Sequence, residues 1–236
     1  MQTIMYRSED RGSANHGWLQ AKHSFSFGNF YNPNLMHFGV LRVLNDDIIE
    51  ASMGFGTHPH DNMEIITIPL EGALAHKDSM GHSSIIKAGE IQVMSAGTGI
   101  QHSEYNALDD QSINLLQIWL FPNKRNVTPR YQQQELDTAE MHNKWSQVLS
   151  PSADDQGVWI HQDAWFHMGE FDAGKEMSYE MKDPLNGLYV FVIEGEADIE
   201  GLKLGKRDAA GITQATAVPF RFTEKSKVLL LEVPMS

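Results

Sequence analysis

The 236-residue sequence has no cysteine, which excludes disulfides, thiolate metal sites, iron–sulfur clusters and cysteine nucleophiles. Any bound metal must therefore be held by His, Asp or Glu. Basic residues are also scarce, because 18 Lys and Arg are set against 31 Asp and Glu, for a net charge of −13. A surface of this sign repels phosphate backbones and anionic bilayers, so we expect no direct binding to nucleic acid or membrane.

Long apolar runs are missing as well. The longest is Leu188–Ile193, six residues, far short of a membrane span. The first residues, Met1–Gly12, are charged and contain no apolar stretch of the kind found in signal peptides. The expectation is a soluble cytoplasmic protein.

Short apolar or alternating segments, separated by Gly, Asn, Asp or Pro, fill most of the chain. This spacing predicts an all-β fold of antiparallel strands in a sandwich or barrel. One short helix is predicted from a cap at Asp137 or Thr138 through Ala139–Asn143. The expected strands are Phe38–Leu44, Glu64–Leu70, Ala73–Asp78, Ile91–Met94, Asn114–Phe121, Val158–His161, Tyr189–Glu194, Ala197–Glu200 and Lys227–Val233.

A weak internal repeat favours two domains. One apolar segment runs into Glu71-Gly72, and a similar apolar segment runs into Glu194-Gly195. Glu-Gly after a strand is, however, also a common turn. Between the copies, the polar segment Thr128–Ser152 carries the helix signal and is the natural connector.

Histidine is the residue type in excess. Of the eleven histidines, five lie between positions 58 and 102. Residues two apart on a strand point to the same face, so His58 projects with His60, and His102 projects with Glu104. Two such strands that meet inside a barrel would surround one point with three imidazoles and a carboxylate.

Glycines frame these residues where a site built on strands needs tight turns. Gly54 and Gly56 precede the His-x-His pair, Gly97-Thr98-Gly99 precedes His102, and Asn106 follows His102 at i+4. This framed arrangement resembles the two motifs of the cupin superfamily. Further segments are similar to the pirin family within it: Asn15–Leu19, His23–Phe27, Gly54–His60, Ser79–Gly81 and Ser95–Asn106.

The resemblance implies a bacterial pirin-like bicupin of the quercetin 2,3-dioxygenase type, with two antiparallel β-barrel (jelly-roll) domains and a short linker helix. It implies a metal-binding cupin at residues 1–130, then a linker and a second cupin without metal ligands at 131–236. General cupins take a Glu ligand from the first motif, where this chain has Ile65, with Glu64 one residue away on the opposite face. Pirins take the carboxylate from the second motif, which is Glu104 here.

The resulting ligand set is His58, His60, His102 and Glu104. It suits one divalent transition metal, foremost Fe(II), with Mn, Co, Ni, Cu and Zn as alternatives. An octahedral ion would keep two open positions, whereas four-coordinate Zn would be closed. Four further residues could support the ligands by hydrogen bonds, and each is equally well explained as an ordinary turn or surface residue: Glu64, Ser103, Tyr105 and Asn106.

The remaining histidines receive structural explanations. His76 and His82 are expected to face solvent, and His16 and His23 to pack or cap the N-terminal segment. That segment is rich in aromatic residues, from Trp18 to Tyr31, and either covers a barrel mouth or completes the core.

Two functions from different classes follow from the resemblance. In the first, the protein opens a flavonol ring with dioxygen and releases carbon monoxide, with Glu104 as the base for the 3-hydroxyl; its partners are a small aromatic substrate and O2, and it is expected to be a monomer. In the second, it is a metal-bound regulatory module that binds a protein partner without turnover. Another cupin chemistry, such as sugar isomerisation, is disfavoured because no Lys or Arg cluster accompanies the motifs.

Overall fold

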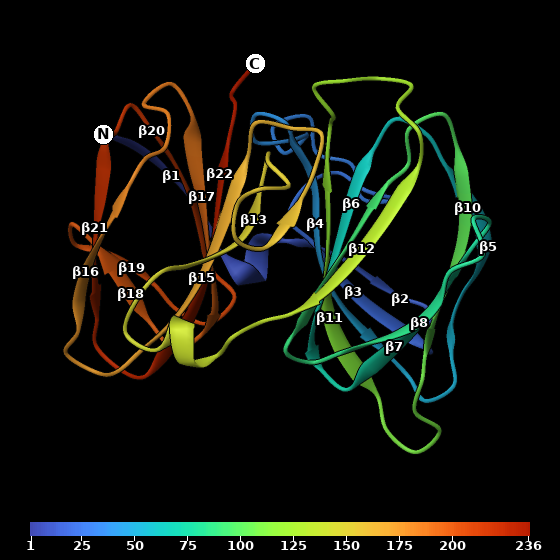
Figure 1. Cartoon of the computed structure of the whole chain (residues 1–236). Coiled ribbons are helices and arrows are strands. Elements are labelled where there is room, and N and C mark those ends of the chain that lie inside the picture. The colour runs from blue at the N-terminus through green and yellow to red at the C-terminus, as the bar shows by residue number, and fades with distance from the viewer.

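The computed structural model describes residues 1–236 as two β-sandwiches that lie side by side (Figure 1). Helical structure is limited to two single turns of 3-10 helix, η1 (Ser8–Asp10) and η2 (Ala139–Met141). No helix has the length and apolar character needed to cross a membrane. The all-β prediction is confirmed, and the predicted linker helix is reduced to one turn.

The first sandwich faces a seven-stranded sheet, in the order β12-β9-β6-β11-β4-β3-β2, with a four-stranded sheet, β5-β10-β7-β8. Its strands are β2 (Gly12–Asn15), β3 (Leu19–His23), β4 (Leu41–Ile49), β5 (Gly54–His60), β6 (Glu64–Glu71), β7 (Ala73–Asp78), β8 (Ser83–Lys87), β9 (Glu90–Ser95), β10 (Ile100–Asn106), β11 (Ile113–Leu120) and β12 (Arg130–Glu135).

The second sandwich repeats this plan with a seven-stranded sheet, β1-β20-β17-β22-β15-β13-β14, and a four-stranded sheet, β16-β21-β18-β19. Its strands are β1 (Gln2–Tyr6), β13 (Ser146–Ser150), β14 (Val158–Trp159), β15 (Trp165–Phe171), β16 (Glu176–Glu180), β17 (Gly187–Glu194), β18 (Ala197–Ile199), β19 (Leu202–Leu204), β20 (Ala209–Thr213), β21 (Ala217–Phe222) and β22 (Ser226–Val233).

Two open sheets make up each domain, since no hydrogen-bonded pair joins the seven-stranded sheet to the four-stranded one. The predicted bicupin is therefore confirmed, with each cupin a sandwich rather than a closed barrel.

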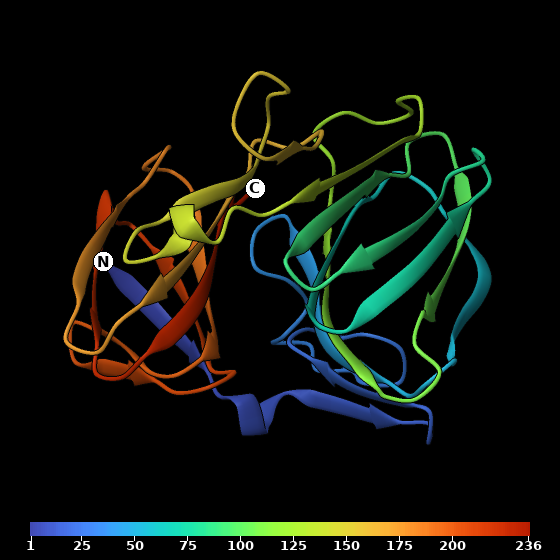
Figure 2. The same ribbon diagram turned by 60° about the horizontal axis from the view of Figure 1, so that its bottom comes forward.

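The N-terminal strand β1 belongs to the second sandwich, where it pairs antiparallel with β20 from Gln2↔Thr213 to Tyr6↔Ala209. The chain then passes through η1 and enters the first sandwich at β2, as the dark blue segment in Figure 2 shows. At the other end of the first sandwich, β12 continues to Glu135 beside β9. The sheets thus divide the chain differently, at both ends, from the expected 1–130 and 131–236.

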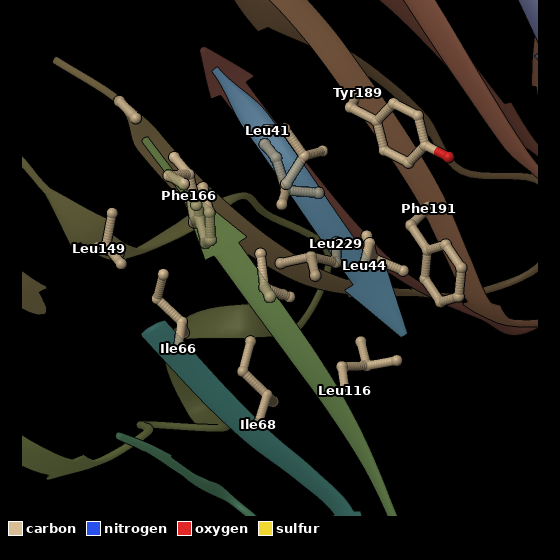
Figure 3. Close-up of a cluster of buried hydrophobic side chains, with 14 of the residues drawn as sticks. Leu41, Leu44, Ile66, Ile68, Leu116, Leu149, Phe166, Tyr189, Phe191 and Leu229 are labelled. Atoms are coloured by element: carbon tan, nitrogen blue, oxygen red, sulfur yellow. The ribbon is translucent and has the colours of Figure 1, made fainter. Parts of the chain in front are cut away.

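The two seven-stranded sheets pack against each other and bury a shared apolar cluster (Figure 3). Residues from both sandwiches contribute to it, and those labelled in the figure are Leu41, Leu44, Ile66, Ile68, Leu116, Leu149, Phe166, Tyr189, Phe191 and Leu229. Both faces of these sheets are therefore buried, which explains the nearly continuous burial of β6 and β17.

Strand alternation divides the first large sheet into two faces. Ile66, Ile68 and Leu116 point toward the second sandwich, so Thr67 and Gln117 point into the interior of the first. The register continues a polar row across five neighbouring strands, in which each member lies opposite the next: Gln92, Thr67, Gln117, Asn45 and His23. All but Gln117 are fully buried. Two members of this polar row, Asn45 and Gln117, line the cavity of the candidate site.

Candidate metal centre

Three histidines converge between the two sheets of the first sandwich. β5 and β10 pair so that His102 lies directly opposite His58, and His60 follows two residues along the same strand. The ring centroids are 4.4 Å apart for His58 and His102, and 4.9 Å apart for each of the other two pairs. One ring nitrogen from each residue lies within 4.8 Å of the others, a spacing that a single metal ion can bridge. The structure therefore brings together the three histidines that the sequence predicts to meet.

Hydrogen bonds orient two of the rings. Nδ1 of His58 donates to the carbonyl oxygen of Gly56 at 2.8 Å, which leaves its Nε2 free. Nδ1 of His102 lies 3.2 Å from Nε2 of His76, so a proton on that Nδ1 leaves Nε2 of His102 free as well. Such outer contacts fix the tautomer of a metal-binding histidine.

Two nitrogens in this cluster are buried without any partner: Nε2 of His60 and Nε2 of His102. Buried polar atoms are nearly always hydrogen-bonded, so a pair of unpartnered imidazole nitrogens in one cluster fits a metal. Burial lowers the pKa of His60 to about 4 and that of His102 to about 2, with the neighbouring histidines adding to the effect. Both rings are thus neutral at physiological pH, the state in which imidazole binds metal.

Glu104 is fully buried but is not part of the three-histidine cluster. Its carboxylate accepts bonds from Nε2 of Gln117 at 3.1 and 3.3 Å and a long bond, 3.4 Å, from the hydroxyl of Thr67. The strand register shifts between His102 and Glu104, which sets Glu104 opposite Phe55. Burial raises the pKa of Glu104. Its role as a fourth ligand stays a prediction.

A cavity of about 410 Å³ connects these groups. His58 and His60 line it from the four-stranded sheet together with Glu104, and the large sheet contributes the opposite wall. The lining residues of that wall are Asn45, Asp47, Gln117 and Trp119. Polar groups therefore line the cavity from both sheets.

The aromatic N-terminal segment contributes to both the cavity wall and the core. Trp18 packs edge-on against Phe55 at 5.2 Å, and Phe27 packs edge-on against Trp119 at 5.4 Å; all four line the cavity. Phe25, between them in sequence, is fully buried in the cluster shared by the two sandwiches. The segment therefore contributes to the core, as one of the two alternatives expected, and other residues of it line the cavity.

The residues that were candidates for supporting the ligands do not line the cavity. Asn106 holds a turn, since its amide donates to the carbonyls of Ile49 and Gln111. Tyr105 is exposed, and neither it nor Ser103 lines the cavity. Their ordinary structural explanations hold.

Glu64 is buried outside the cavity, where its carboxylate accepts from the hydroxyl of Ser95 at 2.7 Å. Burial raises its pKa to about 7, although the His161 backbone N–H and the Arg130 charge oppose the shift. This position agrees with the sequence, in which Glu64 lies one residue from the position of the general cupin ligand and therefore points to the opposite face of the strand.

The expectation that His76 faces solvent is wrong. His76 is 1% exposed and stacks on Tyr131 as well as contacting His102. On β7 it shares a face with the buried Leu74 and Asp78, and this period-two pattern was the available signal. His82 is exposed as predicted, and His23 is buried against Asn45, whereas His16 is exposed.

Sequence reasoning also missed Asp47, Thr67 and Gln117. They lie on strands far apart in the chain. The lateral register of β4, β6 and β11 brings Asp47 and Gln117 to the cavity wall and Thr67 beside Glu104. No local motif marks them.

Comparison with known proteins identifies the family of this chain. The Pirin family profile matches residues 6–120, and the profile described as Quercetinase C-terminal cupin domain matches residues 147–233. The chain belongs to the pirin family. Its relatives include the quercetin 2,3-dioxygenase of Escherichia coli K12, 42% identical over 232 residues that make up 97% of each chain.

A putative quercetin 2,3-dioxygenase of Pseudomonas aeruginosa is 39% identical, over 98% of this chain and 99% of its own. A pirin-like protein of Caulobacter vibrioides is 36% identical, over 94% and 95%. Among solved structures, the bacterial pirin YhhW of E. coli in complex with nickel(II) is 40% identical, with a TM-score of 0.94 over all of both chains. The pirin assignment of this chain therefore rests on sequence and structure together.

Proposed function

We propose that this pirin-family protein is a metal-dependent dioxygenase that opens a flavonol ring at a mononuclear site formed by His58, His60, His102 and Glu104. The observation that carries the proposal is the convergence of three histidine nitrogens within 4.8 Å at a cavity that also contains a buried carboxylate. The name quercetin 2,3-dioxygenase of the E. coli relative supports the choice of substrate. The nickel(II) complex of YhhW supports a divalent metal, and we propose Fe(II) as the ion in this chain.

The same proposal assigns different roles to the two domains. The first sandwich carries the metal, and the second carries no ligands. The protein is proposed to act as a monomer on a small aromatic substrate and O2.

When bound, a divalent metal would supply a Lewis acid for a flavonol oxygen and a redox centre between the flavonol and dioxygen. Glu104 takes the proton of the 3-hydroxyl, because it is the one carboxylate of the proposed ligand set and lies in the cavity wall. Gln117 and Thr67 hold that carboxylate in place. Flavonol and dioxygen together yield a ring-opened ester and carbon monoxide, so every atom is accounted for.

Aromatic walls complete the arrangement. Phe55, Trp18 and Phe27 line the cavity and match the flat rings of a flavonol. They also keep water away from the reacting atoms.

The direct test is aerobic incubation of the iron-loaded protein with quercetin while the flavonol absorption is followed. We expect turnover in the wild type, no metal retention after His102→Ala, and retained metal with strongly reduced kcat after Glu104→Gln. His142→Ala, at an exposed histidine in the linker, is the matched control and should behave as the wild type.

A wild-type protein that is fully loaded with iron but does not turn over quercetin would refute the proposed enzymatic activity. Capture of protein partners from lysate by metal-loaded and chelated protein would then test the regulatory alternative. Full activity of the Glu104→Gln protein would refute the role of Glu104 as the base.

A further inference from the structure

Asp47 is a second carboxyl group in the wall of the metal cavity. It lies on β4, two residues after Asn45 and on the same face of the strand, and its side chain lines the cavity that contains His58, His60 and Glu104. Asp47 is 4% exposed. Neither the proposed ligand set nor the proposed base uses it.

Its neighbours in the cavity wall have partners within the protein. Asn45 accepts a bond from His23 at 2.9 Å. The amide nitrogen of Gln117 is committed to Glu104. Oδ1 of Asp47, in contrast, is buried and bonded to nothing in the chain. A buried oxygen without a partner lowers stability, and a ligand that bonds to it removes that cost.

One further polar atom of the same wall is also free. Nε1 of Trp119 is buried without a partner, and Trp119 lines the cavity on the adjacent strand β11. The wall of the cavity thus contains a carboxyl oxygen and an N–H donor in addition to the histidine nitrogens. A ligand that satisfies the carboxyl group and the N–H while it binds at the histidine cluster has oxygens at several positions.

We propose that Asp47 determines substrate specificity by hydrogen-bonding a ring hydroxyl of the flavonol remote from its metal-binding oxygens, while the Trp119 N–H binds another substrate oxygen. This inference rests on the proposed function and adds to it the preference for polyhydroxylated substrates. Phe55 and Phe27 supply apolar contact that any flavonol can use, so they do not discriminate between hydroxylation patterns.

The protonation state of Asp47 suits this role. Burial, together with the charges of Asp46 and Glu104, raises its pKa to about 8. A protonated carboxyl both donates and accepts, so it can pair with a hydroxyl without an ion being left inside the cavity.

The test compares two flavonols, quercetin and 3-hydroxyflavone, which keeps the 3-hydroxyl and the carbonyl but lacks the other ring hydroxyls. Dissociation constants are measured by fluorescence on iron-loaded protein without oxygen, so that binding is separated from turnover. Asp47→Ala should weaken quercetin binding at least about tenfold and change 3-hydroxyflavone binding by less than about twofold. Asp47→Asn, which keeps the size and the hydrogen-bonding capacity, should restore most of the quercetin affinity.

Ile48→Ala is the matched control, because Ile48 is the next residue of β4 and is exposed. It should bind both flavonols as the wild type does. Metal content is measured on every variant, since a loss of iron after Asp47→Ala would indicate a purely structural role and overturn the inference.

The outcomes separate this inference from the proposed enzyme. Equal losses for both flavonols, or no loss for either, overturn the role of Asp47 even if the wild type turns over quercetin. Asp47-dependent quercetin binding without aerobic turnover would support Asp47 and refute the dioxygenase. A wild type that binds neither flavonol refutes both.

Discussion

The two sandwiches share one strand plan but fill their interiors differently. Between its sheets the first has a cavity with histidines, carboxyl groups and amides. The second is filled by apolar side chains, with Phe171 and Phe222 stacked at 4.1 Å and Trp145 packed edge-on against Phe171. The same architecture therefore encloses a cavity lined by polar groups in one copy and a packed apolar core in the other.

Buried carboxyl groups and histidines show a related contrast. In the second sandwich, Glu232 is completely buried and each carboxylate oxygen accepts two bonds. The donors are the Tyr179 hydroxyl at 2.8 Å and, each at 2.9 Å, the backbone N–H groups of Lys182 and Asp183 and the amide of Asn186. In the first sandwich, His60, His102 and Asp47 each keep a buried atom unpartnered. Partnered polar groups stabilise a fold, whereas unpartnered ones around a cavity are available to a ligand.

The largest expected effect comes from creating a cavity in the apolar core of the second sandwich. Phe222→Ala removes a completely buried ring from the Phe171 stack and should lower the free energy of unfolding by about 3–5 kcal/mol. Urea unfolding measures the change, and metal analysis of the folded fraction should show an unaltered metal content. Leu185→Ala, at a side chain that is 83% exposed, is the control. An equally stable Phe222→Ala protein would contradict the description of this interior as a packed core.

The second effect concerns Glu64, a buried carboxyl group with fewer donors than Glu232. Its folded-state pKa of about 7 lies above the ordinary value of 4.5, so folding binds its proton more tightly. The wild type should therefore be most stable below about pH 4.5 with respect to this group and should lose about 3 kcal/mol as the pH rises from about 4.5 to about 7.

Glu64→Gln removes that titration. Thermal unfolding between pH 5 and 8 should show a flatter profile for the variant than for the wild type. The groups around Glu64 are Ser95, the His161 backbone and the Arg130 guanidinium, which the substitution leaves unchanged. Parallel pH profiles would contradict a raised pKa.

The smallest effect tests the support of the metal centre. His76→Leu removes the ring that contacts Nδ1 of His102 and should weaken metal binding at least about tenfold, because outer contacts orient a ligand. Titration with a metal-sensitive dye measures the affinity, and His76→Gln, which keeps an acceptor, should recover part of it. His82→Ala, which alters an exposed histidine that also stacks on Tyr131, should not change the affinity. Equal losses in the His76→Leu and His82→Ala proteins would contradict a specific role for His76.

Local pattern was enough for much of the fold. The predicted strand Ala73–Asp78 coincides with β7, and Glu64–Leu70 lies within β6, because apolar periodicity and flanking turns are local properties. The predicted helix Ala139–Asn143 is reduced to one 3-10 turn because it has no repeating apolar face to bury; only Met141 is buried, and Asn143 has a φ of 55°.

The sequence by itself determined two all-β cupin domains and the meeting of His58, His60 and His102, because the alternation of a strand and the spacing of two motifs are written along the chain. Tertiary structure alone decided that β1 joins the opposite sandwich and that His76, Asp47 and Gln117 surround the histidines. These contacts depend on the register between distant strands. That register minimises the free energy of the whole assembly, and no short segment of sequence encodes it.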